Sequence, residues 1–481
     1  MLVGFAKADV TPAIGKEVPG SLTKRYNTAI HDPLYATAAV FEQEGRRVAL
    51  VGLDNLSVKA SVVRRAREII AGKCGIPGSH VMVGASHTHN GGPCMGALPG
   101  DFARASDPEL CERLAQEYST AGDAHYQEEL AGQIATAVIC ADQSKQEAVA
   151  YVGRGHEASV VHNRRFIMKD GTQMTHPGKG NPDIVEPAGP VDPEVGVLAA
   201  WSTAGEFLGV VVNYALHGTV FGGGVSADWP YYMRQLVTDA LNPGAHVVFL
   251  NGACGDVTQV DNLSMQESEF GEKWARRVGY RVGGEVIRTI ADAEPGELAP
   301  IAAAAKTIAL KTREVSRERY EAALVAIDQM LAAGESPSGE LVFHRDEVLL
   351  YELNRWEPEV ECEVQALQIG PVVYLSNPAE YFCRFGLDIK RRSRFPFTWV
   401  VELANGCVGY VPTPEALGEH GGGYEPRLAL SSKLVPEAGQ MIADASVELA
   451  NALTPGEVPP RPTVDSPGRP WGWGASSSSK A

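Results

Sequence analysis

Two histidines separated by a single residue are the first chemically informative feature of the sequence. The segment at 86–92 reads SHTHNGG and follows an apolar run at 80–85 directly. We expect a buried strand over that run, and in extended backbone residues i and i+2 point the same way. His87 and His89 would then face one site at a strand end, where α/β proteins place ligands. Imidazole suits zinc, but an HxH pair alone is equally typical of structural or surface histidines.

A third histidine ends a second apolar run. The sequence NYALHGT places His217 just after a strand predicted at 207–214. Without other support, a histidine in this position is usually a satisfied core residue rather than a ligand. Asp228 follows, immediately before a predicted helix. Its carboxylate is equally suited to capping that helix and to supporting a zinc-bound histidine by hydrogen bonding.

Three further segments carry polar groups that are weak signals when taken alone. The run LNGACGDVTQ ends in a turn of small residues that can present the Thr258 hydroxyl and backbone N–H groups to a carbonyl, although an ordinary glycine-rich turn explains it better. Glu380, in SNPAEYF, is expected in the first turn of a helix, where a carboxylate favours the helix dipole and can also complete a zinc site. Tyr410 in GYVPT and Tyr424 in GYE belong to a residue type that usually packs in cores or interfaces.

The elements that must position these residues alternate between strands and helices. Apolar periodicity predicts strands at 35–42, 47–54, 80–85, 197–202, 207–214, 246–250, 361–376 and 397–403. It predicts helices at 60–71, 125–141, 268–293, 316–333, 379–392 and 436–452, another after Pro230, and a hairpin turning at 169–171. This mixture indicates an α/β fold with mixed β-sheets layered with α-helices. We expect one domain over 1–455 and a Pro/Gly/Ser-rich tail over 456–481.

Composition excludes several classes of function. The chain has 42 Lys plus Arg against 59 Asp plus Glu, a net charge of -17, which argues against nucleic acid and anionic membranes as partners. The longest span without charged side chains, 207–227, contains a histidine and several glycines, so we expect no membrane insertion. Eight scattered cysteines without a CxxC pair or a secretion signal predict reduced thiols and a cytoplasmic location. A small-molecule substrate and a homo-oligomer are compatible with this composition.

Taken in order, these segments resemble the neutral/alkaline ceramidase family. The resemblance runs from the opening ADVTP at 8–12 to the last helix, through HTH, ALHGT, GDVT, NPAE and GYVPT. It implies a ceramidase-like catalytic domain with a Zn2+ amidohydrolase site. By matching motifs, the zinc ligands would be His87, His217, Glu380 and Tyr410. The substrate would be contacted or polarised by His89, Tyr410 and Tyr424 and bound by Asn163 and Arg164, with Thr258 in the place of the family's serine nucleophile.

Departures from the family pattern bear on the substrate. The family has GDVSP, HTHSGPGG and HPT where this sequence has GDVTQ, HTHNGGP and HGT. We also expect a short form, without the family's β-rich C-terminal domain and secretion signal. A soluble polar amide is therefore favoured over ceramide. Thr258 could serve as an acylated nucleophile or hold a water molecule by hydrogen bonding, and the second role is slightly favoured because a β-branched hydroxyl is more hindered than that of serine.

Other functions stay open at this point. A zinc esterase or lactonase would use the same groups, as would an amidase of N-acyl lipids. Binuclear amidohydrolases and metallo-β-lactamases also use HxH, but the latter expect HxHxDH and the sequence continues HTHNGG. A non-catalytic binding protein with a vestigial site is the remaining alternative.

Overall fold

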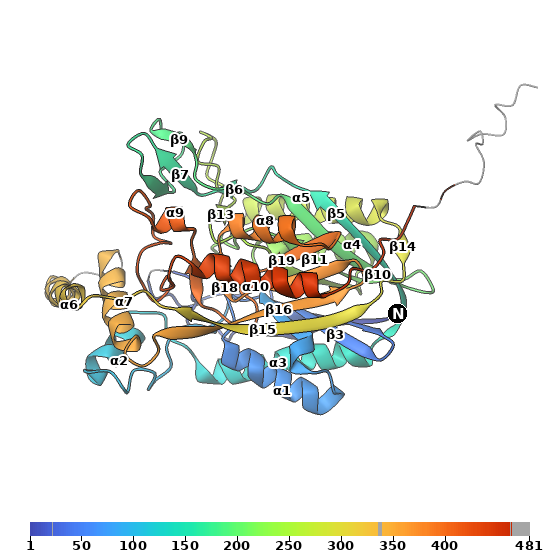
Figure 1. Cartoon of the computed structure of the whole chain (residues 1–481), viewed down its shortest axis with the longest axis horizontal. Helices are drawn as coiled ribbons and strands as arrows, with labels where there is room; N and C mark the ends of the chain where they lie inside the picture. The colour runs from blue at the N-terminus through green and yellow to red at the C-terminus, as the bar shows by residue number, and fades with distance from the viewer. Residues whose placement is uncertain (22, 335–338, 462, 464–481) are drawn as a thin grey trace, which may run out of the picture.

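The largest sheet has nine strands and supplies the segments that carry the histidines (Figure 1). The structure is a computed structural model that describes residues 1–21, 23–334, 339–461 and 463. The strand order is β12-β11-β10-β5-β1-β2-β3-β4, with β14 beside β5. Both ends of the sheet are parallel pairs, β3 with β4 and β11 with β12, and the rest is antiparallel. The bounds are β1 Leu2–Asp9, β2 Tyr35–Gln43, β3 Arg46–Leu53, β4 Val81–Ala85, β5 Gln146–His156, β10 Glu194–Ser202, β11 Phe207–Tyr214, β12 His246–Asn251 and β14 Pro295–Gly296.

This sheet folds over so that its two ends meet. Strand β12 packs against β2, β3 and β4 rather than lying far from them. Glycines allow the close approach: a Cβ atom at Gly52 of β3 would lie 2.4 Å from the carbonyl oxygen of Phe249 in β12. A Cβ atom at Gly84 of β4 would lie 3.2 Å from the Leu250 side chain of β12. Because any larger residue would push these backbones apart, the glycines fix the distance between the two ends of the sheet.

A second sheet and three pairs of helices complete the layers. The sheet runs β15-β16-β17-β19 and shares one apolar core with the large sheet, centred on Trp399 and Tyr374. Helices α1 and α3 cover the side of β1 and β2, α4 and α5 cover the side of β10 to β12, and α8 and α10 cover the second sheet (Figure 1). The bounds are β15 Ile301–Lys311, β16 Glu359–Ile369, β17 Val372–Ser376, β19 Phe397–Val401, α1 Ala60–Cys74, α3 Ala124–Gln143, α4 Trp229–Leu241, α5 Glu272–Asp292, α8 Cys383–Arg392 and α10 Ala438–Ala452. The predicted α/β fold with mixed sheets is confirmed.

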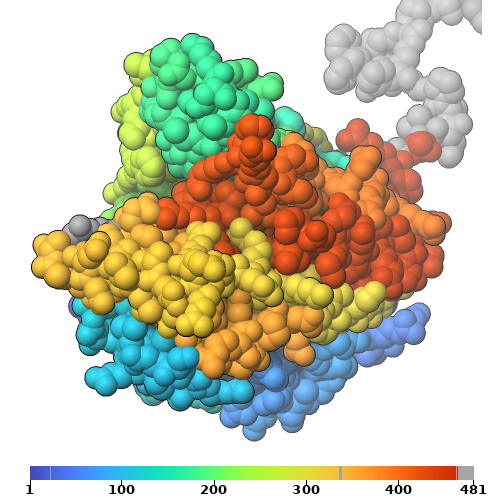
Figure 2. All heavy atoms as spheres, turned by 60° about the vertical axis from the view of Figure 1, so that its left-hand side comes forward, coloured from blue at the N-terminus to red at the C-terminus, as the bar shows by residue number. Residues whose placement is uncertain are grey.

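Short elements surround this body. Two pairs of short strands, β6 with β13 and β18 with β20, lie near the candidate site, and β7, β8 and β9 form a small lobe. In Figure 2 this lobe stands above the red C-terminal segments, and α6 and α7 (yellow to orange) project on another side. The bounds are β6 His162–Asn163, β7 Arg165–Met168, β8 Gln173–Thr175, β9 Ile184–Pro187, β13 Val257–Thr258, β18 Ala379–Tyr381, β20 Gly409–Val411, α2 Pro108–Gln116, α6 Arg317–Ala332, α7 Glu340–Leu353 and α9 Pro414–Leu417, with a 3-10 turn at Gly78–His80.

Three sequence predictions differ from the structure. The helix predicted at 379–392 begins only at Cys383, because the preceding residues form β18 and pair in parallel with β20. The strand predicted at 361–376 is a hairpin that turns at Gly370, whose φ of 58° is left-handed. Helix α7 was not predicted, because Arg345, Asp346 and Glu347 are buried within it and obscure its apolar period.

The C-terminal tail is described only where it begins. The Gly456 amide donates to the carbonyl of Gly370, and Arg461 bonds to the carbonyl of Asp292. Residues 462 and 464–481 lie outside the described residues, and the single domain expected over 1–455 stays a prediction. In the described part of the chain, no helix is long and apolar enough to cross a bilayer.

Candidate metal and catalytic site

The HTH segment, which contains His87, lies beside the HGT segment, which contains His217. These two histidines are 130 residues apart in the sequence. Thr88 and Gly218 pair as in a parallel sheet, and the His89 amide donates to the Gly218 carbonyl at 3.0 Å. A Cβ atom at residue 218 would lie 2.6 Å from the His87 carbonyl oxygen, so the contact requires glycine there. The glycine that follows His217 is therefore what allows the two histidine-bearing segments to touch.

An asparagine at the end of β12 ties the same strand ends together. The Asn251 side chain accepts a hydrogen bond from the Leu216 amide at 3.2 Å and donates one to the Ser86 carbonyl at 3.3 Å. These two groups immediately precede His217 and His87. The carboxyl ends of β4, β11 and β12 are thus fixed to one another at the candidate site, in agreement with the expectation that ligands sit at strand ends.

His87 and His89 face the same point, but not by the geometry that the sequence predicts. His87 has a φ of 62°, in the left-handed region, so the backbone there turns instead of continuing the strand. A non-glycine residue held in this region costs about 1–3 kcal/mol and such residues cluster at functional sites. The ring centroids of His87 and His89 are 4.8 Å apart, and those of His87 and His217 are 4.4 Å apart.

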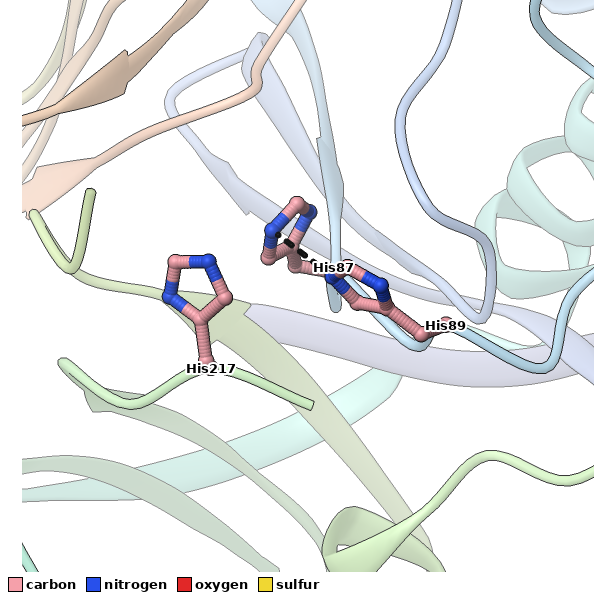
Figure 3. A group of neighbouring side chains, drawn as sticks. All are labelled: His87, His89 and His217. Atoms are coloured by element: carbon pink, nitrogen blue, oxygen red, sulfur yellow. Dashed lines mark hydrogen bonds between the residues drawn. The ribbon is translucent and has the colours of Figure 1, made fainter. Parts of the chain in front are cut away.

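The three imidazoles converge and are held in one tautomer (Figure 3). One ring nitrogen from each lies within 4.8 Å of the others. The Nδ1 atoms of His87, His89 and His217 bond to the carbonyl oxygens of Leu56, Gly20 and Cys254, at 2.9, 2.7 and 2.8 Å. Because a carbonyl only accepts, each Nδ1 donates its proton to the backbone and each Nε2 points into the site, where Nε2 of His89 lies 3.4 Å from Nε2 of His87 and Nε2 of His217 accepts from Arg164 at 3.1 Å. This is the arrangement of metal-binding histidines, whose other nitrogen is fixed by a backbone carbonyl or a carboxylate.

Glu380 adds a carboxylate to two of these rings. Its Oε2 lies 3.4 Å from Nε2 of His87 and 3.8 Å from Nε2 of His217. That oxygen is buried and has no hydrogen-bond partner among the described residues. A buried carboxylate oxygen without a hydrogen-bond partner, beside the Nε2 atoms of two histidines, is unfavourable unless a cation or a proton lies between them. Two imidazoles and a carboxylate form a donor set that fits a zinc ion.

The pKa values of His87, Glu380 and His217 reflect their burial and the charged groups beside them. Burial lowers the pKa of His87, but the Glu380 carboxylate outweighs it and holds that pKa above its ordinary value. Burial raises the pKa of Glu380, but the His87 ring and the Tyr410 hydroxyl bring it below the ordinary value. Burial, together with the positive charge of Arg164, lowers the pKa of His217 well below its usual range, so this ring is neutral.

Tyr410 and Arg164 lie beside the ligand candidates. Tyr410 is the register partner of Glu380 in the β18–β20 pair. Arg164 is buried, donates to the Tyr410 hydroxyl at 3.2 Å and lies 3.1 Å from Nε2 of His217. Its charge is balanced by Glu425, at 2.8 Å from Nε. Burial raises the pKa of Tyr410 well above its ordinary value, so its hydroxyl remains a donor.

His89 and Tyr424 lie farther toward solvent. His89 is partly buried, and burial together with the neighbouring His87 lowers its pKa to about 3. Tyr424 is 41% exposed, with its ring centroid 6.0 Å from that of Tyr410 and the Arg164 guanidinium 5.3 Å from the centre of its ring. These two side chains therefore border the candidate ligands on the exposed side.

Thr258 and Asn163 are buried nearby, with their polar atoms bonded to the protein. The Thr258 hydroxyl donates to the Gln259 side chain at 3.2 Å and accepts from the Val260 amide at 3.3 Å. The Asn163 side chain donates to Asp256 at 2.8 Å. Within residues 1–21, 23–334, 339–461 and 463, no hydrogen bond joins either side chain to the three histidines or to Glu380. The predicted roles of Thr258 and Asn163 stay predictions.

Glu402 is a buried residue that sequence reasoning missed. One of its oxygens accepts from the amides of Cys254 and Tyr381, at 2.9 and 2.8 Å, and the other accepts from the Cys254 thiol. Cys254 supplies the carbonyl that holds His217, and Tyr381 directly follows Glu380. One carboxylate thus fixes the loops behind two ligand candidates. Its sequence signal is an acidic residue at the end of an apolar strand, whereas the role of the Cys254 carbonyl leaves no trace in the sequence.

Asp228 is a helix cap. Its carboxylate accepts from the amides of Trp229 and Phe221, at 2.6 and 2.9 Å, at the start of α4. The Trp229 indole in turn donates to the backbone carbonyl of His217 at 3.1 Å. The capping interpretation is confirmed, and the imidazole of His217 is held by Cys254 instead of Asp228.

Comparisons with known proteins give a structural likeness and no sequence match. No protein-family model and no curated protein matches the sequence. Among solved structures, one described as "Ceramidase complexed with C2" superposes with a TM-score of 0.69 and 18% identity, covering 95% of this chain and 77% of that one. The neutral ceramidase from Pseudomonas aeruginosa gives a TM-score of 0.68 and 20% identity, with 95% and 76% coverage. The chain therefore has a ceramidase-like α/β fold with a group of histidines that could bind a metal.

Proposed function

We propose that this chain is a zinc-dependent hydrolase that cleaves a C–N amide bond in a soluble, polar small molecule rather than in ceramide. One observation carries the proposal: a buried carboxylate oxygen of Glu380, without a hydrogen-bond partner among the described residues, lies 3.4 and 3.8 Å from the Nε2 atoms of His87 and His217. The ceramidase-like fold and the ordered motifs support amide hydrolysis as the reaction class. The departures from those motifs around His89 and Thr258 support a substrate other than ceramide.

The ligand set is typical of a catalytic rather than a structural zinc site. His87, His217 and Glu380 would hold the ion, with the Tyr410 hydroxyl beside them, and three protein ligands leave room for substrate. A bound zinc ion would polarise a substrate carbonyl as a Lewis acid, and it would lower the pKa of a bound water molecule to about 7. The remaining chemistry belongs to the side chains around the ligands.

Tyr410 is the group that would stabilise negative charge on the substrate. Its phenol keeps its proton, because burial raises its pKa, and can donate to a carbonyl oxygen that becomes negative during attack. Arg164 orients this phenol by donating to its oxygen at 3.2 Å. Tyr424, on the exposed side, can donate a second hydrogen bond to the substrate.

His89 is suited to accept a hydrogen bond rather than to donate one. Its proton is fixed on Nδ1 by the Gly20 carbonyl at 2.7 Å, and its pKa of about 3 keeps the ring neutral near pH 7. Its Nε2 can therefore accept from the attacking water or from the N–H of the substrate amide, whereas an oxyanion would require a donor. Thr258 remains the candidate for holding a water molecule.

The metal proposal is tested with a matched pair of histidine variants. His217→Ala removes a proposed ligand, and His125→Ala removes an exposed imidazole on α3 whose side chain is 79% exposed. We expect one zinc per chain in the native protein and in His125→Ala by elemental analysis, and none in His217→Ala. Full zinc retention by His217→Ala would refute its role as a ligand. Paired amides and esters of the same acyl groups then distinguish an amidase from an esterase.

A further inference from the structure

Arg25 is a cation held against the candidate site by the N-terminal loop. The loop is closed by a bridge between Glu17 and Tyr26 and by a hydrogen bond from the Val18 amide to the Arg25 carbonyl at 2.9 Å. From there the Arg25 side chain donates from Nη2 to the backbone carbonyl of His89 at 3.0 Å. Arg25 is thus connected directly to the residue that borders the metal ligands on the exposed side.

The guanidinium of Arg25 lacks a counter-ion. Its Nε is buried with no hydrogen-bond partner, and no carboxylate in the described part of the chain lies within 4.0 Å of it. The acidic residue in its own loop, Glu17, is engaged by Lys24 at 2.6 Å and by the amide of Ala121 at 2.9 Å. Burial lowers the pKa of Arg25, with no acidic group to offset the effect. A partly buried cation without a partner is costly and is suited to receive an anion.

Lys433 is a second cation, in a segment whose backbone pairs with the strand that carries Tyr410. Its ammonium donates to the Leu430 carbonyl at 3.3 Å, and none of the described carboxylates lies within 4.0 Å of it. Two residues earlier, the Ser431 carbonyl accepts from the Tyr410 amide at 2.7 Å. Burial lowers the pKa of Lys433, an effect opposed from farther away by Cys407 and Glu357.

These positive charges stand out in a chain whose net charge is -17. A partly buried positive charge attracts anions locally, and an acidic surface elsewhere does not cancel that local field. Guanidinium groups bind carboxylates with short, charge-assisted hydrogen bonds. Among the described residues only the His89 carbonyl accepts from Arg25, and because Nε is buried, the terminal nitrogens are the donors that can meet an incoming carboxylate.

We propose that the amide substrate of this site carries a carboxylate, which Arg25 receives beside His89. This inference rests on the proposed hydrolase function, because it names the class of substrate that the same site takes. It assigns Arg25 as a specificity-determining residue that is separate from the metal ligands.

The test compares matched substrates that differ only in charge. N-acetyl amino acids carry a free carboxylate, and their C-terminal carboxamides are neutral copies of similar size. The variants are Arg25→Gln, Arg25→Lys and, as a control, Arg46→Gln, which changes the exposed first residue of β3. Binding of each pair to zinc-loaded protein is measured by calorimetry, and hydrolysis by release of acetate.

We expect the native protein to bind the anionic member of a pair at least about tenfold more tightly, as charge-assisted hydrogen bonds typically allow. Arg25→Gln should abolish the preference, Arg25→Lys should keep part of it, and Arg46→Gln should leave it unchanged, with zinc content equal in all four proteins. Equal binding of both members to the native protein, or binding of neither, would overturn the inference. Preferential binding without any hydrolysis would support Arg25 and count against the proposed hydrolase function, so the two failures are distinguishable.

Discussion

The ligand side and the substrate side of the candidate site are built in opposite ways. On the ligand side, His87 and His217 are each fixed through Nδ1 by a backbone carbonyl, and Glu380 is fixed by the register of β18 with β20. On the substrate side, Arg25 makes one side-chain hydrogen bond and has no carboxylate within 4.0 Å among the described residues, and Tyr424 is 41% exposed. The comparison indicates that side chains which must bind a metal in a fixed geometry are held by hydrogen bonds to the surrounding backbone. Side chains that recognise the substrate instead keep hydrogen-bond donors available for it.

The largest expected effect is on the ligand side. Glu380→Gln removes the charge that faces two histidines while keeping the size of the side chain. We expect loss of bound zinc and a fall in kcat of at least about 10³-fold, because the Lewis acid is worth several kcal/mol. Glu68→Gln, on the exposed face of α1, is the control and should match the native protein. A Glu380→Gln protein with full zinc and normal turnover would show that Glu380 does not belong to the ligand side of the site.

The next effect concerns the donor beside the ligands. Tyr410→Phe removes the phenol that Arg164 orients at 3.2 Å. We expect kcat to fall by about 10²-fold, the usual consequence of losing one oxyanion donor. Zinc content, measured by elemental analysis, should remain close to one per chain. Loss of zinc together with activity would instead make Tyr410 an essential ligand, and unchanged kcat would exclude it from the reaction.

A smaller effect is expected behind the ligands, at Glu402. Its carboxylate holds both the Cys254 loop and the Tyr381 amide, at 2.9 and 2.8 Å. Glu402→Gln should weaken zinc binding about 10- to 100-fold, as is typical for partners that orient metal ligands. Competition with a zinc chelator measures this affinity. If Glu402→Gln binds zinc as tightly as the native protein, the hydrogen bonds that Glu402 accepts do not account for the geometry of the ligands.

The smallest effect is expected at Thr258, whose hydroxyl is bonded to Gln259 and Val260. Thr258→Ala should keep turnover within about tenfold of the native value, as expected when one hydrogen bond to a water molecule is lost and no covalent step is removed. Single-turnover measurements on zinc-loaded protein check this. Complete loss of turnover with zinc retained would favour Thr258 as the nucleophile.

The sequence predicts the ligand side better than the substrate side, for a physical reason. Strand ends, glycines after histidines and ordered motifs are local signals, and they identify His87 and His217 even though the left-handed turn at His87 is not foreseen. Glu380 is identified by its motif, although its strand is mistaken for a helix. The unpaired state of Arg25 depends on which distant groups fail to reach it, and no local pattern records that. Glu402 acts through backbone amides, which have no residue identity.

The central claim is that one zinc ion is bound by His87, His217 and Glu380. Anomalous diffraction at the zinc absorption edge, on crystals of the zinc-loaded protein, tests it most directly. The account predicts a single peak in contact with Nε2 of both histidines and with the Glu380 carboxylate, and Nε2 of His89 outside bonding distance. A peak held by the three histidines with Glu380 turned away, two peaks, or a peak elsewhere in the molecule would contradict it.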